Sequence, residues 1–191
     1  FFNKTINLSI NFLEAQSQLT SVKLMKNSED SLLISEHLID DTPRKDSPKI
    51  EELKNKINSG LFEEVEKECH SLIKLNNSDK AIFYLLLSHS LYGQFKLEES
   101  INYLEKSIEI NPELTGNYRL KATLLSRLGK DKEAISVCKK LIKNNTKDVK
   151  TLIQLGFLYK KNDRHKEAKE AYEKALEIEP NNSHAQGGLS M

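Results

Sequence analysis

Tryptophan is absent from this chain of 191 residues, and proline, glycine and cysteine are scarce, with 4, 7 and 2 residues respectively. So few turn-forming residues disfavour a β-sandwich or barrel, whereas the abundant Leu, Lys, Glu and Ile favour helices. The two cysteines, Cys69 and Cys138, cannot make a disulfide framework, and neither has a Cys-x-x-Cys partner. We therefore expect a helical protein of a reducing, cytoplasmic compartment, without a metal site or a cofactor.

Long apolar runs are also missing. None approaches the roughly 18 residues that a membrane-spanning helix needs, so we expect no contact with a membrane. The chain begins FFNKTINLSINFLEAQ, without an initiator methionine, a basic segment or the long apolar core of a signal peptide. We expect a fragment of a longer protein that is not secreted.

Enzyme motifs are missing too, since the chain contains no P-loop, G-x-G-x-x-G, H-E-x-x-H or G-x-S-x-G sequence. Cys69 beside His70 could be a nucleophile or a metal ligand, but Cys69 falls in an apolar column, which predicts a core position. The glutamates between Glu63 and Glu68 could pair for acid–base chemistry, yet a helix would spread them over a solvated face. We therefore predict a protein that is not an enzyme.

What the sequence does contain is an internal repeat with a period of 34 or 35 residues. Two columns of small residues recur at this spacing, namely Ser88, Ala122 and Gly156, and Ser100, Ala134 and Ala168. Each unit has two short amphipathic stretches, which predict two helices that approach closely at the small residues. Because isolated helices of about a dozen residues are marginal in water, each must bury its apolar stripe on its partner and on the next unit.

The last unit shows the pattern most clearly. Its two amphipathic stretches, TLIQLGFLYK and HKEAKEAYEKALEI, are separated by NDR, in which Asn162 or Asp163 is the predicted N-cap of the second helix. Pro180 ends the unit.

The periodicity sets the predicted boundaries. A helical extension at 1–40, with a diverged repeat as the alternative, is followed by a linker at 41–48 and a repeat array at 49–191. The units are 47–79, 80–112, 113–146 and 147–180, followed at 182–191 by the start of a fifth unit or a capping helix.

These columns resemble the tetratricopeptide repeat (TPR), a 34-residue pattern of a large residue, Leu-Gly, Tyr, Ala, an aromatic residue, Ala and Pro. The last unit matches at Leu152, Leu155, Gly156, Tyr159, Ala168, Tyr172, Ala175 and Pro180. Earlier units depart from it, with Lys121 where Leu is expected and Thr146 where Pro is expected. The resemblance covers 47–191. It implies an all-α fold, an α-solenoid of antiparallel helical hairpins in a right-handed superhelix, and a protein–protein interaction scaffold.

Charge is distributed unevenly along the chain, although the net charge is only +1. Between residues 114 and 166 there are 14 Lys and Arg against 4 Asp and Glu, whereas residues 1–113 have 13 against 19. One explanation of this excess is that lysine is a common residue on solvated helix surfaces. The alternative is a groove or ridge that attracts an acidic partner.

The resemblance also implies where a partner would bind, because in this family the first helix of each unit builds a concave face. The corresponding residues are Ile82, Leu85, His89, Tyr92, Arg119, Thr123, Ser126, Arg127, Lys150, Ile153, Phe157, Lys160 and Lys161. This face would be apolar in the second unit and cationic in the fourth, and would suit an extended, acidic protein or peptide with an apolar stretch. A sub-family clamps a C-terminal carboxylate, but of its positions only Lys150 matches here.

Two other functions remain open. The array could be one arm of a larger enzyme, for example a transferase. It could also bind nucleic acid through its basic part, although the aromatic residues that stack on single-stranded bases are sparse.

Overall fold

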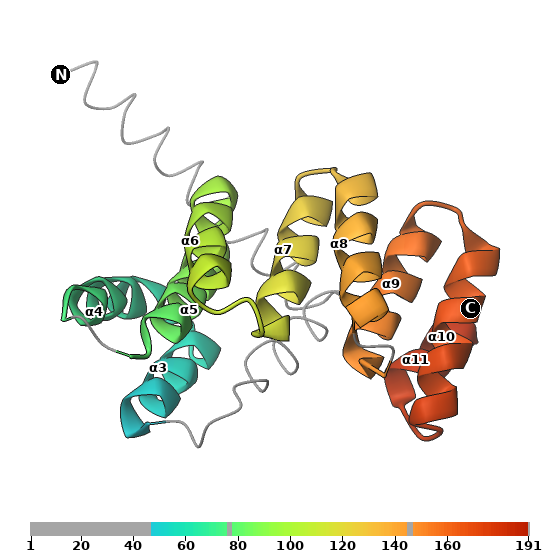
Figure 1. Cartoon of the computed structure of the whole chain (residues 1–191), viewed down its shortest axis with the longest axis horizontal. Helices are drawn as coiled ribbons and strands as arrows, with labels where there is room; N and C mark the ends of the chain where they lie inside the picture. Colours follow the sequence, from blue (N-terminus) through green and yellow to red (C-terminus); the bar gives the residue numbers. More distant parts are fainter. Residues whose placement is uncertain (1–46, 76–77, 145–146, 191) are drawn as a thin grey trace, which may run out of the picture. The chain divides into compact units, whose positions relative to one another are not determined.

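Nine α-helices follow one another in the residues that the computed structural model describes, which are 47–75, 78–144 and 147–190 (Figure 1). They are α3 (Pro48–Asn58), α4 (Phe62–Lys74), α5 (Lys80–Gly93), α6 (Leu97–Ile110), α7 (Thr115–Arg127), α8 (Asp131–Asn144), α9 (Val149–Lys161), α10 (His165–Ile178) and α11 (Ser183–Leu189). No strand occurs within these ranges. The predicted extension at 1–40 and most of the predicted linker at 41–48 lie outside the described residues.

The helices pair as hairpins, as the repeat predicts. α3 packs on α4, α5 on α6, α7 on α8 and α9 on α10, and α11 packs on α10 in the place of a fifth unit's first helix. First helices of successive units also touch, at α3–α5, α7–α9 and α9–α11, whereas no two second helices make a comparable contact in the described ranges. The first helices therefore form an inner layer and the second helices an outer layer, as in an α-solenoid.

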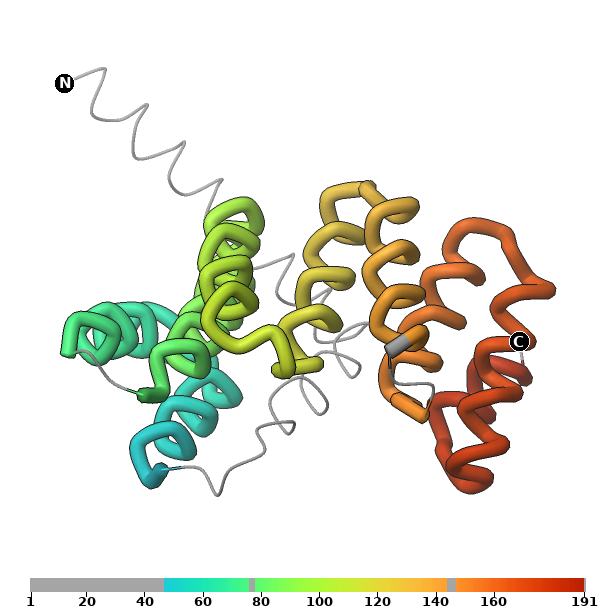
Figure 2. Tube along the Cα trace, viewed as in Figure 1, coloured from blue at the N-terminus to red at the C-terminus, as the bar shows by residue number. Residues whose placement is uncertain are grey.

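Figure 2 traces the chain through the successive hairpins. The turn between the two helices has the same backbone conformation in all four units. One residue is left-handed in each, with φ of 79° at Gly60, 62° at Phe95, 73° at Gly129 and 56° at Asp163. The N–H of the next residue donates to the carbonyl five residues back, at 2.8 to 2.9 Å in every unit. This is the Schellman motif, which satisfies carbonyls at the end of the first helix.

The Schellman turn also corrects one expectation. Neither Asn162 nor Asp163 caps α10. Asp163 is instead the left-handed residue that ends α9, and Arg164 holds the N-cap position of α10 without a side-chain hydrogen bond.

The small-residue columns meet inside each hairpin. Ser88 and Ser100 are both buried, with their hydroxyl oxygens 2.8 Å apart, and the Ser100 hydroxyl donates to the carbonyl of Ser88 at 2.7 Å. Ala122 and Ala134 are completely buried at the equivalent place. In the last unit an added Cβ on Gly156 would lie 2.7 Å from Cε1 of Tyr172, so only glycine leaves room for that ring.

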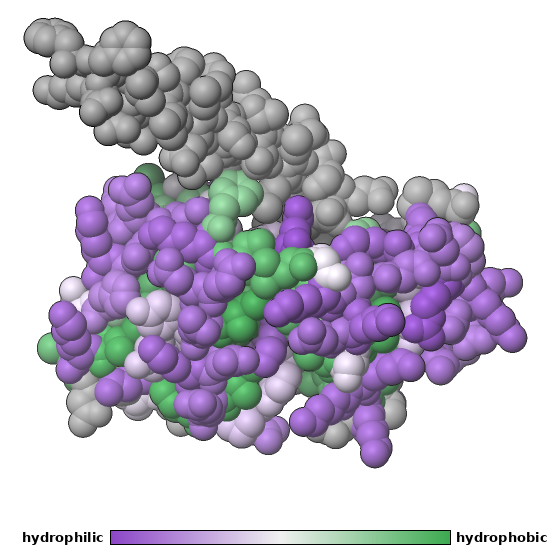
Figure 3. All heavy atoms as spheres, turned by 90° about the horizontal axis from the view of Figure 1, so that it is seen from above, coloured by the Kyte–Doolittle hydropathy of each residue, from purple (hydrophilic) through white to green (hydrophobic). Residues whose placement is uncertain are grey.

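Apolar side chains of α3, α4 and α5 pack together in one core. The core around the first two units contains Ile50, Leu53, Val65, Cys69, Phe83, Leu86, Leu87 and Leu91. The predicted core position of Cys69 is confirmed, and burial raises the pKa of its thiol to about 12. On the face drawn in Figure 3, hydrophilic residues predominate and apolar ones gather in patches between them. Within the described ranges, no helix has the length and apolarity needed to cross a bilayer.

We expect Gly156→Leu to lower the free energy of unfolding by about 1–3 kcal/mol, because the new side chain must displace the Tyr172 ring from a packed interface. Chemical denaturation measures the change. Gly187→Leu is the matched control, since nothing lies within 4 Å of a Cβ added at Gly187. Equal unfolding midpoints for the two variants would contradict this packing.

Candidate functional site

The predicted partner-binding residues lie on three inner-layer helices, α5, α7 and α9. Five of them are buried: Leu85, His89, Tyr92, Arg119 and Ile153. Seven are half-buried: Ile82, Thr123, Ser126, Arg127, Lys150, Phe157 and Lys160; Lys161 is exposed. That they bind a partner stays a prediction, but their contacts show what each can offer.

Arg119 does not present its charge to an open groove. Its side chain is only 4% exposed, and Nη1 lies 2.9 Å from Oδ2 of Asp148, which is itself 8% exposed. Asp148 is the N-cap of α9, because its carboxylate accepts hydrogen bonds from both the backbone N–H and the hydroxyl of Thr151. Burial lowers the pKa of Arg119, and the charge of Asp148 opposes that shift. The pair therefore joins the third unit to the fourth.

Further polar contacts join α7 and α9. Gln154 donates from Nε2 to the carbonyl of Arg119 and to the hydroxyl of Thr123, both at 2.9 Å. Lys161 donates to the carbonyl and hydroxyl of Ser126, at 3.0 and 2.9 Å. We call this set the polar seam: Arg119, Thr123, Ser126, Asp131, Asp148, Thr151, Gln154 and Lys161.

Four members of the polar seam were not among the predicted site residues: Asp131, Asp148, Thr151 and Gln154. The carboxylate of Asp131 accepts a hydrogen bond from the ammonium group of Lys161 at 3.0 Å and another from the hydroxyl of Ser126 at 2.6 Å. Asp148 carries a local signal that would have identified it, because aspartate just before the first residue of a helix is a preferred N-cap. Gln154 has no such signal, because its partners depend on how the units stack.

His89 is a buried titratable group on α5. It is 4% exposed, and its Nε2 atom finds no hydrogen-bond partner among the described residues. Burial lowers the pKa of His89 from its ordinary value to about 4, so the imidazole is neutral near pH 7.

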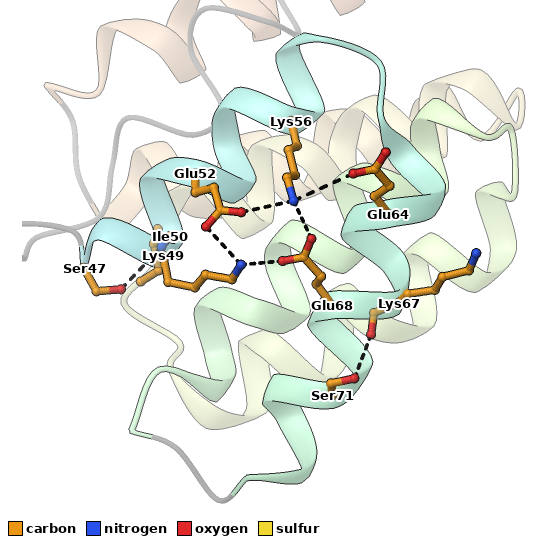
Figure 4. A network of polar contacts seen from close by, with 9 residues as sticks. All are labelled: Ser47, Lys49, Ile50, Glu52, Lys56, Glu64, Lys67, Glu68 and Ser71. Atoms are coloured by element: carbon orange, nitrogen blue, oxygen red, sulfur yellow. Dashed lines mark hydrogen bonds and ion pairs between the residues drawn. The ribbon is translucent and has the colours of Figure 1, made fainter.

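The carboxylates of the first unit pair with lysines and not with one another (Figure 4). Glu68 binds Lys49 and Lys56, and Glu52 lies 3.0 Å from each of the same two ammonium groups. Hydrogen bonds from Lys49 and Lys56 lower the pKa of Glu68, which keeps it ionised. A carboxylate held in this way is a poor general acid, as expected for a solvated face.

Metal and thiol chemistry find little support in this part of the chain. No group of three or more His, Cys, Asp or Glu residues is arranged to hold a metal ion within 47–75, 78–144 and 147–190. Burial raises the pKa of Cys138 to about 12, as it does for Cys69, so both thiols stay protonated at neutral pH. His70 packs edge-on against Tyr103, with the ring centroids 5.7 Å apart.

Arg119→Met should lower the free energy of unfolding by about 3 kcal/mol, because it leaves the Asp148 carboxylate buried without its cation. Adding Asp148→Asn should recover part of this loss. Arg164→Met removes an exposed pair with Glu167 and should cost less than about 1 kcal/mol. Urea denaturation compares the stabilities of the variants. If Arg119→Met unfolds at the wild-type midpoint, the ion pair between Arg119 and Asp148 does not stabilise the fold.

Acid should destabilise the protein through His89. The pKa of His89 is lower in the folded protein than in the unfolded chain, so the unfolded chain binds the proton first as the pH falls. The contribution of His89 to the free energy of unfolding is therefore fully present above about pH 6.5 and is lost toward pH 4. We expect the slope, at most about 1.4 kcal/mol per pH unit, to shrink in His89→Gln. The exposed His165 provides the control His165→Gln. Thermal melts between these pH values measure the slopes, and equal slopes for wild type and His89→Gln would refute this role.

Known proteins share both the sequence pattern and the fold. Residues 92–191, more than half of the chain, match the family model described as the Psidin, N-terminal TPR repeats region. A TPR repeat-containing protein of Methanocaldococcus jannaschii is 35% identical over 99 residues, which are 52% of this chain and 31% of that protein. The chain thus spans about a third of the length of this curated relative.

Two solved structures resemble the fold. A thermophilic TPR protein of Thermus thermophilus superposes with a TM-score of 0.67 at 18% identity, over 95% of this chain and 98% of that one. The first TPR of Spaghetti (RPAP3), bound to the HSP90 peptide SRMEEVD, gives a TM-score of 0.55 at 28% identity, over 60% of this chain and 90% of that one. Together with the family match and the repeated Schellman hairpins, these likenesses show that the chain belongs to the tetratricopeptide-repeat family represented by the N-terminal region of Psidin.

Proposed function

We propose that the array is a non-enzymatic scaffold that binds an extended segment of a partner protein along the inner layer of α5, α7 and α9. The observation that carries this proposal is the composition of one side of α9. Lys150, Phe157 and Lys160 are half-buried there and recur at spacings of seven and three residues, which place them on one helix face. The Spaghetti structure, with its bound peptide, supports a segment as the partner.

The partner's chemistry follows from these side chains. Ile82 on α5 and Phe157 on α9 offer apolar surface, and Lys150 and Lys160 offer positive charge. We therefore propose a segment with at least one apolar side chain and at least one carboxylate. The polar seam has another role here, because it fixes the spacing between α7 and α9 and so the spacing between binding positions.

A purely binding role is supported by the state of the reactive groups. Both cysteines are buried with raised pKa values, and the paired carboxylates of the first unit are held as ions by lysines. Two free, buried thiols also support a reducing, cytoplasmic setting. With partly exposed contacts and screened charges, we expect a dissociation constant of about 1 μM to 1 mM.

A displayed library of random peptides of about ten residues tests the site. We expect the full chain to enrich sequences that combine an apolar residue with Asp or Glu. Phe157→Ala with Lys150→Gln should weaken the best peptide about tenfold or more, because it removes both an apolar and a cationic contact. Titration of the labelled peptide, followed by fluorescence anisotropy, measures the change.

The matched control lies on the outer layer. Lys169→Gln with Lys174→Gln on α10 changes two exposed lysines and should leave peptide binding within about twofold. If the inner-layer variant binds as tightly as wild type, the partner binds elsewhere on the array. If no peptide is enriched while single-stranded nucleic acid binds with a steep salt dependence, the protein-scaffold proposal is wrong.

A further inference from the structure

Lysines dominate the solvent-facing side of α8. Lys132, Lys139, Lys140 and Lys143 are all exposed, and we call these four residues the lysine ridge. At 100° per residue they fall within about 100° of the helix circumference, together with the exposed Ser136, while Glu133 lies at the edge of this stripe in the first turn. The opposite side of α8 is buried through Ala134, Cys138 and Leu141. From Lys132 to Lys143 the ridge runs about 16 Å along the helix axis.

The equivalent helices of the neighbouring units lack this ridge. Thirty-four residues before Lys139, Lys140 and Lys143, α6 has Glu105, Lys106 and Glu109. Thirty-four residues after them, α10 has Glu173, Lys174 and Glu177. Both neighbours therefore show Glu-Lys-x-x-Glu, with a net charge of −1, where α8 shows Lys-Lys-x-x-Lys, with a net charge of +3. The repeat itself does not require lysine at the two changed positions.

Helix stability does not explain the ridge either. Lys139 and Lys143 are separated by four residues, so their like charges repel each other on the helix surface. The helix dipole favours Lys143 in the last turn, but it disfavours Lys132 in the first. In the described ranges, no ion pair joins a carboxylate to any of the four ammonium groups. The ammonium group of Lys139 lies 5.8 Å from the ring of Tyr159. The pKa of Glu167 is lowered mainly by a hydrogen bond from an arginine and in smaller part by the charge of Lys139.

We propose that the lysine ridge docks an acidic segment of a partner protein. This goes beyond the proposed function, because the ridge lies on an outer-layer helix and its residues are not those of α5, α7 and α9. The charges on α8 repel one another, and carboxylates spaced along about 16 Å would neutralise them together. The ridge would therefore recognise a row of carboxylates. An acidic helix of three turns, or a shorter segment in an extended conformation, supplies such a row.

A protein partner fits this surface better than the other polyanions do. The solvent-facing stripe of α8 has no aromatic residue, and stacking on exposed aromatic rings is how single-stranded nucleic acid is held. Large exposed apolar side chains in the described ranges lie at Leu61, Leu75, Ile110, Ile178 and Leu189, none of them on α8. A helix that binds a lipid surface needs such side chains to insert.

The test uses the full chain and a labelled peptide of about a dozen residues, half of them glutamate, a length that covers the ridge. Lys139→Glu with Lys143→Glu restores the pattern of α6 and α10, so the variant should fold. Its peptide affinity should fall about tenfold or more at about 0.05 M salt, and the difference should shrink at higher salt. Fluorescence anisotropy measures affinity, and circular dichroism confirms that the helices are intact.

The matched control is Lys166→Glu with Lys174→Glu on α10, which changes the net charge equally at exposed positions. It should alter the affinity less than about twofold. An equal loss in both variants would show that overall charge, not the ridge, attracts the peptide and would overturn the proposal. If either oligothymidylate or phosphatidylserine vesicles bind more tightly than the glutamate-rich peptide, with the same dependence on Lys139 and Lys143, the proposal of a protein partner is wrong.

One further variant separates this proposal from the inner-layer site. Phe157→Ala with Lys150→Gln should leave the binding of the glutamate-rich peptide unchanged if the ridge is its site. Loss of that binding would assign the acidic peptide to the inner layer and overturn the ridge. Retained binding would support the ridge, whatever the result of the random-peptide experiment.

Discussion

The two helices of each unit must approach closely before the units can stack. This approach needs a small residue on each helix at the crossing, as at Ser88 with Ser100 and at Ala122 with Ala134. It also needs a turn that reverses the chain in a few residues, which the left-handed residue of the Schellman motif provides in every unit. Once the hairpin is set, each apolar stripe has one side left to bury, and the next unit covers it.

Stacking of the units then uses polar groups of the inner layer that the sequence assigned to partner binding. Arg119 illustrates this, because its position on an inner helix suggests a binding residue while its contact with Asp148 makes it a structural one. A buried guanidinium without a carboxylate would be costly, so the two residues depend on each other. The half-buried residues that remain, such as Phe157 and Lys150, define a narrower candidate surface than the sequence suggested.

The positive charge of the middle of the chain is accordingly divided between two layers. Part of it lies on the inner side of α9, and part on the solvent-facing side of α8, where the neighbouring units carry glutamates instead. Exposed charges act at a distance of about a Debye length, roughly 10 Å at 0.1 M salt, so we expect the two proposed surfaces to attract acidic segments independently. A scaffold with two such surfaces could hold one partner by two separate segments.

The helical hairpins could be predicted from the sequence, because columns such as Ser100, Ala134 and Ala168 repeat at a fixed spacing and each unit must bury the same stripe. The sequence also placed Cys69 in the core.

The role predicted for Asp163 was wrong, because an aspartate before a helix suggests a cap equally well when the backbone uses it as the end of the previous helix. The partners of Arg119, Gln154 and Lys161 could not be predicted in this way. Their hydrogen bonds join residues about 30 positions apart and depend on how closely two units stack, which no local pattern encodes.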